Sequence, residues 1–204
     1  MKIAVIGAGN VGRAVGQAWA TKGHDVVYGV RDPARAGHPP QCRTVAGAVA
    51  DADVVLLAVM FHAIEDALKD CGDLSGRILI DPTNPLAPDA GGLKLSLGFE
   101  TSSAEFIAAR TSATVVKSLN QVGAAVLGDT SGYPVRPVQF VAGNDVAAKR
   151  TVTRLVEELG FEVLDAGPLV AARLLEPMAM VWIDQAMRYG MDPNRAWALQ
   201  KRRP

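Results

Sequence analysis

The feature that most constrains the fold of this chain is a glycine pattern near its start, Gly7-x-Gly9-x-x-Gly12. A short apolar run leads straight into the pattern, and apolar residues with helical spacing follow it at once. In that order the first glycine permits a sharp turn, the second leaves room for a pyrophosphate beside the backbone, and the third lets the helix pack closely on the strand. The alternative, a purely structural turn, is disfavoured by the strand before it and the helix after it. The loop therefore predicts dinucleotide binding through the residues Gly7, Ala8, Gly9, Asn10, Val11 and Gly12.

Composition narrows the possible partners. The chain has 204 residues, of which 49% are hydrophobic, enough to bury a full core. A formal net charge of +0 provides no general attraction to nucleic acid or to an anionic membrane, and 5% aromatic residues are few for base stacking. No apolar run approaches the roughly 18 residues of a membrane span, the start resembles a strand rather than a targeting peptide, and Cys42 and Cys71 lack the spacing of a metal site. We therefore expect a cytoplasmic protein without a metal, a nucleic-acid partner or a membrane partner.

Strand-like and helical patterns alternate along the chain. Apolar, β-rich runs predict strands at 2–6, 25–30, 53–59, 77–80, 114–118, 138–142 and 161–165. Helical spacing predicts helices at 10–22, 44–51, 62–70, 103–109 and 145–159. The Gly- and Pro-rich segment 86–100 is expected to be a loop. This alternation predicts an α/β fold with a doubly wound, Rossmann-type, mostly parallel sheet and right-handed crossovers.

The segment from 169 to about 189 has an unusual apolar pattern. Its apolar residues go nearly all round a helix, which predicts burial on all sides. A sheet domain of this size covers one side, so we expect a second copy of the chain to cover the other, although burial inside one large core would also satisfy the pattern. Pro177 is expected to kink or divide this helix. We therefore predict a dinucleotide-binding domain, 1–168, and a short helical C-terminal extension, 169–204, that packs on the same domain and joins a homodimer.

The end of the second strand separates the two common nicotinamide cofactors. NAD sites place an acidic residue about 20 positions beyond the glycines, whereas Arg31 stands here, with Arg35 one turn further if a helix starts at Asp32. Two guanidinium groups suit a 2′-phosphate, which arginine binds through paired hydrogen bonds. Asp32 could instead bond a ribose hydroxyl, but it is also placed to cap a turn. The pattern favours NADP(H) over NAD, with a solvated basic face as the alternative role of the arginines.

Several blocks together resemble the coenzyme F420-dependent NADP oxidoreductases, a family of small dinucleotide-binding proteins that also includes the cytosolic domain of the six-transmembrane ferric reductases. The blocks cover nearly the whole chain, at 6–12, 29–33, 58–61, 81–85, 117–123, 142–145 and 164–177, and the last two are the more specific. The resemblance implies an NADP-dependent oxidoreductase that transfers hydride directly between NADPH and a second flat redox cofactor, coenzyme F420 or a flavin. It also implies a dimer joined through the C-terminal helices.

Two segments depart from the pattern of that family. Val30 stands where the family often has Ser or Thr before the specificity arginine, which weakens the NADP preference without reversing it. The segment 128–134 is short and polar, so the side that binds the acceptor is expected to differ from that of the founding enzymes. The identity of the acceptor therefore stays open.

Candidate site residues follow from where ligands bind in an open parallel sheet, at the carboxyl ends of its strands. Val59, Met60 and Phe61 follow the third apolar strand, where the resemblance implies contacts with adenosine and ribose that continue toward the nicotinamide. Asn84 and Asn120 carry amide groups that could fix the nicotinamide carboxamide or the acceptor ring. Asparagine is also a favoured turn residue, which is their alternative role.

No nucleophile or acid–base pair stands out, and direct hydride transfer requires none, because orientation and the cofactors supply much of the rate. His62 could contact the acceptor or a phosphate, with capping or packing as the alternative. Lys117 could counter charge on an acceptor, and Glu176 is expected to close a helical turn. Small residues at 123–125 would leave room for a flat ring. The sequence therefore assigns no catalytic side chain.

Two other functions fit parts of the pattern. Small-molecule NADP-dependent dehydrogenases that act on β-hydroxyacids or imines share the fingerprint and the arginine. They carry a large helical second domain with a catalytic lysine, for which the segment after 169 is too short. A non-catalytic protein that senses NADP(H) would need only the same glycines and arginines. Oxidation of NADPH by one member of a panel of acceptors would distinguish an enzyme from a sensor.

Overall fold

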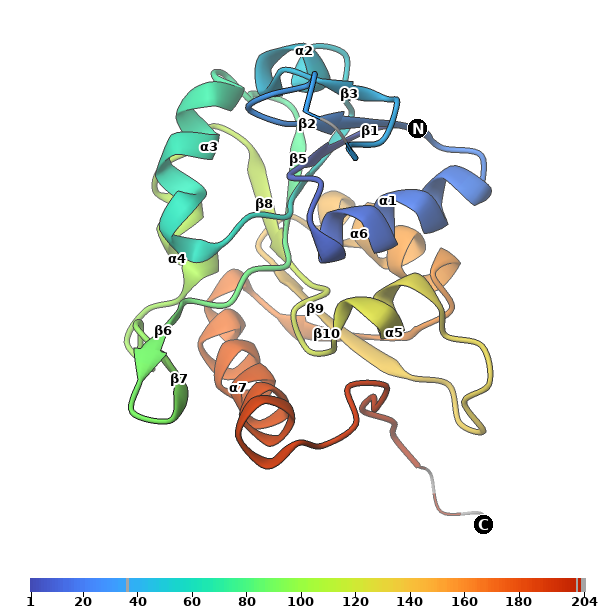
Figure 1. The fold of residues 1–204 in the computed structure, drawn as a ribbon, viewed down its shortest axis with the longest axis vertical. Helices are drawn as coiled ribbons and strands as arrows, with labels where there is room; N and C mark the ends of the chain where they lie inside the picture. The colour runs from blue at the N-terminus through green and yellow to red at the C-terminus, as the bar shows by residue number, and fades with distance from the viewer. Residues whose placement is uncertain (36, 201, 203–204) are drawn as a thin grey trace.

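The computed structural model describes residues 1–35, 37–200 and 202, and it contains an eight-stranded, mostly parallel sheet between two layers of helices (Figure 1). The strand order is β10-β9-β8-β5-β4-β1-β2-β3. The strands of this sheet are β1 (Lys2–Ile6), β2 (Asp25–Gly29), β3 (Cys42–Arg43), β4 (Val54–Leu57), β5 (Ile78–Asp81), β8 (Thr114–Lys117), β9 (Val138–Gly143) and β10 (Glu162–Gly167). The predicted doubly wound α/β fold is confirmed.

The helices cover the two faces of the sheet in separate groups. One face carries α1, α5 and α6, and the other carries α2, α3 and α4 (Figure 1). The helices are α1 (Asn10–Thr21), α2 (Val45–Val49), α3 (Ile64–Cys71), α4 (Ser103–Ala108), α5 (Ala124–Gly128), α6 (Val146–Glu158) and α7 (Ala172–Tyr189), with the short 3-10 helices η1 (Phe61–Ala63) and η2 (Leu169–Ala171). Because both faces are covered, the central strands must be apolar on both sides.

The alternation of side chains along β1 shows how the sequence builds these two layers. Ile3 and Val5 lie in the core on the α1 side, whereas Ala4 and Ile6 lie in the core on the α2 side. Successive residues of a strand point to opposite faces, so a continuous apolar run supplies both cores at once. Trp19 of α1 is fully buried in the first core, where its indole N–H donates to the carbonyl of Leu155 at 2.9 Å.

The segment 86–100 is not the plain loop that its composition predicts. It contains an antiparallel hairpin of β6 (Leu86–Asp89) and β7 (Gly92–Leu95), whose turn includes Gly91 at φ +78°. The hairpin forms a separate two-stranded sheet, and β7 packs against α7 (Figure 1). A two-stranded ribbon is marginal alone, so its strands depend on a helix that lies far along the sequence.

Three other details differ from the sequence-based expectation. The strand β9 runs antiparallel to β8, so the sheet is not parallel throughout and β8 and β9 are not joined by a parallel crossover. The helix α5 and the two-residue strand β3 were not expected, because each is too short to show a period. Residues 32–35 form a turn rather than the start of a helix.

The C-terminal helix α7 runs continuously through Pro177, which therefore does not divide it. Its buried side includes Leu175 and Ala179, and its opposite side exposes Leu174 and Val181 to 67% and 54%. One side of the helix is thus covered by its own chain and the other is apolar and open. Among the described residues no helix is both long and apolar enough to cross a lipid bilayer.

Candidate dinucleotide-binding cleft

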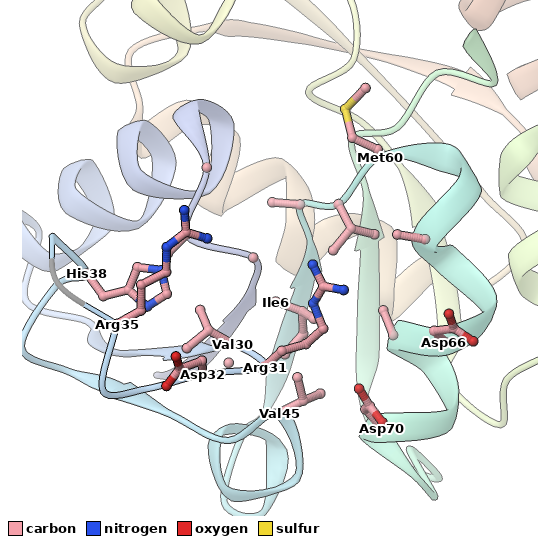
Figure 2. A pocket seen from close by; sticks show the side chains of 18 of the residues that line it. Ile6, Val30, Arg31, Asp32, Arg35, His38, Val45, Met60, Asp66 and Asp70 are labelled. Atoms are coloured by element: carbon pink, nitrogen blue, oxygen red, sulfur yellow. The ribbon is translucent and has the colours of Figure 1, made fainter. Parts of the chain in front are cut away.

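A cleft of about 910 Å³ opens at the carboxyl ends of the central strands (Figure 2). It lies where β1 is flanked by β2 on one side and by β4 on the other. Chains that leave neighbouring strands toward opposite faces create a crevice at that point, the usual ligand site of an open α/β sheet. The structure brings together here most of the residues that the sequence predicted, namely Gly7, Ala8, Gly9, Arg31, Arg35, Val59 and Met60.

Each of the three glycines stands in this loop for a different physical reason. Gly7 has φ +100°, and an added Cβ would lie 2.4 Å from the carbonyl oxygen of Ala58. An added Cβ at Gly12 would lie 2.1 Å from the carbonyl oxygen of Gly7. At Gly9, in contrast, it would meet no described atom within 4 Å. Gly7 and Gly12 are therefore required by the fold, whereas the missing side chain of Gly9 leaves space open in the cleft.

The start of α1 is left free to bind an anion. Gly9 is the N-cap residue, and no side chain within the described structure caps this end or places an acidic group in the first turn. The first N–H groups of a helix have no partner within the helix, and the helix dipole adds partial positive charge there. The predicted residues Asn10, Val11 and Gly12 supply this backbone, and none of the three is among the residues that line the cleft.

Arg31 and Arg35 lie in the turn that follows β2 and line the cleft with exposed side chains. Figure 2 shows Arg31 on the side of α3 and Arg35 beside His38. Neither arginine forms a salt bridge within the part of the chain that the structure describes. The carboxylate of Asp32 instead accepts a hydrogen bond from the backbone N–H of Ala34 at 3.1 Å, so it caps the turn.

Arg13 is a cleft residue that the sequence reasoning missed. Its Nε donates to the carbonyl of Ala8 at 2.6 Å, and its Nη2 donates to the carbonyl of Gly37 at 2.7 Å. One side chain thus connects the glycine loop to the loop that carries Arg31 and Arg35. Its place directly after the third glycine, on the turn of helix nearest the cleft, is the signal that could have identified it.

The wall formed by α3 has the opposite charge. Asp66 and Asp70, four residues apart on one face of the helix, line the cleft together with His62. Figure 2 shows both carboxylates on the α3 side, across from the β2 turn. An anionic group therefore has a favourable position only at the β2 side and at the start of α1.

The other predicted binding residues, Phe61, Asn84 and Asn120, are not among the residues that line the cleft. Phe61 is partly buried and packs against the core beside Phe106, at a ring-centroid distance of 5.4 Å. The amide of Asn84 donates to the carbonyl of Asn120 at 3.0 Å, and the amide of Asn120 donates to the side-chain oxygen of Asn84 at 3.0 Å and to the carbonyl of Leu175 at 3.3 Å. These contacts tie two loops to α7, and a role in binding the nicotinamide stays a prediction.

A second polar centre lies buried at the same edge of the sheet. The Nζ of Lys117, with 0% exposure, lies 3.0 Å from the carboxylate of Asp81 and 2.8 Å from that of Glu176. It also donates to Ser103 Oγ at 3.0 Å and to the carbonyl of Thr83. This centre joins β5, β8, α4 and α7.

The buried centre corrects two expectations. Lys117 is fully engaged by protein groups, so it is not placed to counter the charge of a ligand. Glu176 does not close a turn of its own helix, because its carboxylate accepts the backbone N–H groups of Ser103 at 3.0 Å and Ala104 at 3.4 Å. Lysine at a strand end and glutamate before a proline gave no sequence signal that they would meet.

The fold is α/β, the glycine cradle is open and the start of α1 is uncapped. Two arginines follow the second strand. Together these features define the NADP-type dinucleotide-binding class. The family model described as "NADP oxidoreductase coenzyme F420-dependent" matches residues 2–85. The chain is also similar to the crystal structure of a candidate F420-dependent NADP-reductase from Arthrobacter sp. FB24. That similarity has 33% identity and a TM-score of 0.89, and it covers 98% of this chain and 100% of that one. The protein is therefore a member of the F420-dependent NADP oxidoreductase family, as its motifs predicted.

Two more distant relatives extend the comparison. Metalloreductase STEAP3 from Rattus norvegicus is 31% identical over 184 residues, which are 88% of this chain. The chain spans 36% of the length of that protein. A reductive aminase from Aspergillus terreus shares the fold, with a TM-score of 0.65 at 18% identity over 93% of this chain and 61% of that one.

Proposed function

We propose that this protein binds NADPH in the cleft and exchanges hydride between it and a second flat redox cofactor, with coenzyme F420 as the first candidate and a flavin as the second. The observation that carries the proposal is the open space over Gly9 in the same cleft as Arg31 and Arg35. A pyrophosphate fits the first feature and a 2′-phosphate fits the second. The family of the chain supports the same assignment.

The residues divide the work of binding. The loop from Gly7 to Gly12 and the start of α1 would hold the pyrophosphate through backbone N–H groups. Arg31 and Arg35 would hold the 2′-phosphate, and Asp32 is kept in its turn by the N–H of Ala34. The acidic wall of α3 would keep phosphate groups on the β2 side. This charge pattern sets the direction in which a dinucleotide lies in the cleft.

The catalytic contribution of the chain is orientation. Bound NADPH would supply the hydride, and the protein needs no covalent nucleophile for that chemistry. Val59 and Met60 lie at the end of β4, and Met60 exposes 63% of its surface. Exposed apolar side chains at the edge of a cleft favour contact with a flat ring and exclude water from the reacting faces.

We also propose that a second copy of the chain covers the open side of α7. Leu174 and Val181, seven residues apart on one side of this helix, expose 67% and 54% of their surfaces. A self-complementary apolar face suits a two-fold dimer. Light scattering should give the mass of a dimer, and Val181→Lys should shift it to that of a monomer. A monomeric wild-type protein at micromolar concentration would reject this assembly.

The nucleotide assignment is tested by calorimetric titration with NADPH and NADH. Arg31→Ala should weaken NADPH binding roughly 10- to 100-fold, because a charge-assisted hydrogen bond contributes about 1.5–3 kcal/mol. NADH binding should change little. Arg154→Ala, in an exposed arginine of α6 outside the cleft, is the control and should leave both unchanged. Equal weakening of both nucleotides by Arg31→Ala would reject the assignment of the 2′-phosphate site.

The acceptor is tested by mixing the protein and NADPH with coenzyme F420, FMN, FAD, ferric chelates and quinones in turn. Loss of the nicotinamide absorbance band with coenzyme F420 or a flavin supports the proposed reaction. Oxidation only by a metal chelate or a quinone assigns a different acceptor. Tight NADPH binding without oxidation by any of them indicates a protein that senses NADP(H).

A further inference from the structure

His38 is a cleft residue whose side chain is incompletely satisfied. It lies half-buried next to Arg35 on the β2 side of the cleft (Figure 2). Its Nδ1 is shielded from solvent and has no hydrogen-bond partner within the described residues. A buried polar atom without a partner costs free energy comparable to a lost hydrogen bond. His38 also lines the cleft, so a ligand oxygen there would give this side chain the partner that the described residues do not supply.

The backbone around His38 is held in place. Its N–H donates to the carbonyl of Arg35 at 3.3 Å, and Pro39 and Pro40 follow it directly. Arg13 fixes the preceding residue, because its Nη2 donates to the carbonyl of Gly37 while its Nε holds Ala8 of the glycine loop. The loop that carries His38 is thus set at a fixed distance from the pyrophosphate cradle.

We propose that His38 is a third ligand of the 2′-phosphate, beside Arg31 and Arg35, and that Arg13 is the positioning residue that presents it. This inference rests on the proposed NADP function. The terminal torsion of a histidine is soft, so the ring can turn and bring either nitrogen to a phosphate oxygen that enters the cleft. His38 then contributes to the choice of NADP(H) over NAD(H), which the sequence motif assigned to arginines alone.

The charges around His38 support a phosphate rather than another ligand. Arg31 and Arg35 come from the same turn after β2, Arg13 is bonded to the carbonyl of Gly37 next to His38, and the carboxylate of Asp32 is engaged by Ala34. The remaining acidic groups that line the cleft, Asp66 and Asp70, belong to the α3 wall across from it (Figure 2). A dianionic group is therefore favoured at His38 and disfavoured opposite.

The test isolates the phosphate by comparing adenosine 2′,5′-bisphosphate with adenosine 5′-monophosphate in calorimetric titrations. His38→Asn should weaken binding of the bisphosphate about tenfold, as expected for one hydrogen bond to a charged group. It should leave binding of the monophosphate within about twofold. His24→Asn, at the opposite end of β2 where His24 meets Glu158, is the matched control and should change neither affinity.

Arg13→Lys tests the positioning role, because lysine keeps the charge but cannot hold both carbonyl groups. It should reduce the preference for the bisphosphate, and His38→Asn should then cause little further loss in the double variant. Independent, additive losses would reject the role of Arg13. Equal weakening of both probes by His38→Asn, or of neither, would reject His38 as a phosphate ligand. A wild-type protein without preference for the bisphosphate would instead overturn the proposed NADP function itself.

Discussion

Two polar regions share one edge of the sheet and treat charge in opposite ways. In the cleft, Arg31 and Arg35 are exposed and form no salt bridge within the described residues. In the buried centre, Lys117 is fully enclosed and lies within 3.0 Å of two carboxylates, Asp81 and Glu176. The difference shows that cationic side chains at this edge are either exposed and unpaired within the described residues or buried and paired inside the fold.

The buried centre contains two carboxylates and one ammonium group. The excess of negative charge is met by neutral donors, because Glu176 accepts two backbone N–H groups at the start of α4 and Asp81 accepts the N–H and hydroxyl of Thr83. Such a centre holds its geometry only while every member is present. Arg31 and Arg35 in the cleft have no comparable dependence, since both contact solvent.

The largest expected effect comes from a substitution that breaks the buried centre. Lys117→Met should lower the free energy of unfolding by about 3–5 kcal/mol, because it leaves two buried carboxylates without their cation. Lys149→Met removes a lysine from a partly exposed pair with Asp165 and should cost at most about 1 kcal/mol. Urea denaturation measures both. A Lys117→Met protein as stable as the Lys149→Met protein would show that the centre does not stabilise the fold.

The next effect distinguishes the roles of two glycines in the same motif. Gly12→Ala should destabilise the fold by about 1–3 kcal/mol, because its Cβ would lie 2.1 Å from the carbonyl oxygen of Gly7. Gly9→Ala should leave the melting temperature nearly unchanged and weaken NADPH binding about tenfold or more, because its Cβ projects into open cleft. Thermal unfolding and calorimetry measure the two properties. Loss of stability at Gly9 with unchanged binding would reverse the assignment.

The smallest effect concerns a bidentate pair between α4 and α7, the two helices that supply Ser103 and Glu176 to the buried centre. Arg173 donates to Glu105 at 2.8 and 2.7 Å, and this contact, helped by the hydroxyl of Ser102, lowers the pKa of Glu105 below its ordinary value of 4.5. A lowered pKa means that the stabilisation is complete above pH 4.5 and is lost as the pH falls through the pKa of the folded state.

Glu105→Gln should therefore lower the stability by at most about 1 kcal/mol near neutral pH, since the pair is partly exposed. The difference from the wild type should shrink as the pH falls below 4.5. Denaturation measured from neutral pH to below pH 4.5 tests this expected change in the stability difference. A difference that grows in acid would show that the ion pair is not its source.

The sequence predicted the cleft far better than the buried centre, for a physical reason. The glycine loop and the arginine after β2 are local: each works through its own backbone or an exposed side chain, so a short motif is enough. Lys117 and Glu176 lie on elements that meet only in the folded chain, and neither has a local pattern. The β6–β7 hairpin was missed for the same reason, because α7 supports it. Arg13 and His38 are intermediate cases. Arg13 reaches the loop of His38 through a hydrogen bond to the carbonyl of Gly37, which lies 24 residues further along the chain.

A crystal structure of the protein with NADPH would show directly where the nucleotide binds. We expect the pyrophosphate to lie over Gly9 at the start of α1 and the 2′-phosphate to lie between Arg31 and Arg35. A nucleotide bound elsewhere, or an empty cleft in crystals grown at saturating NADPH, would contradict this expectation.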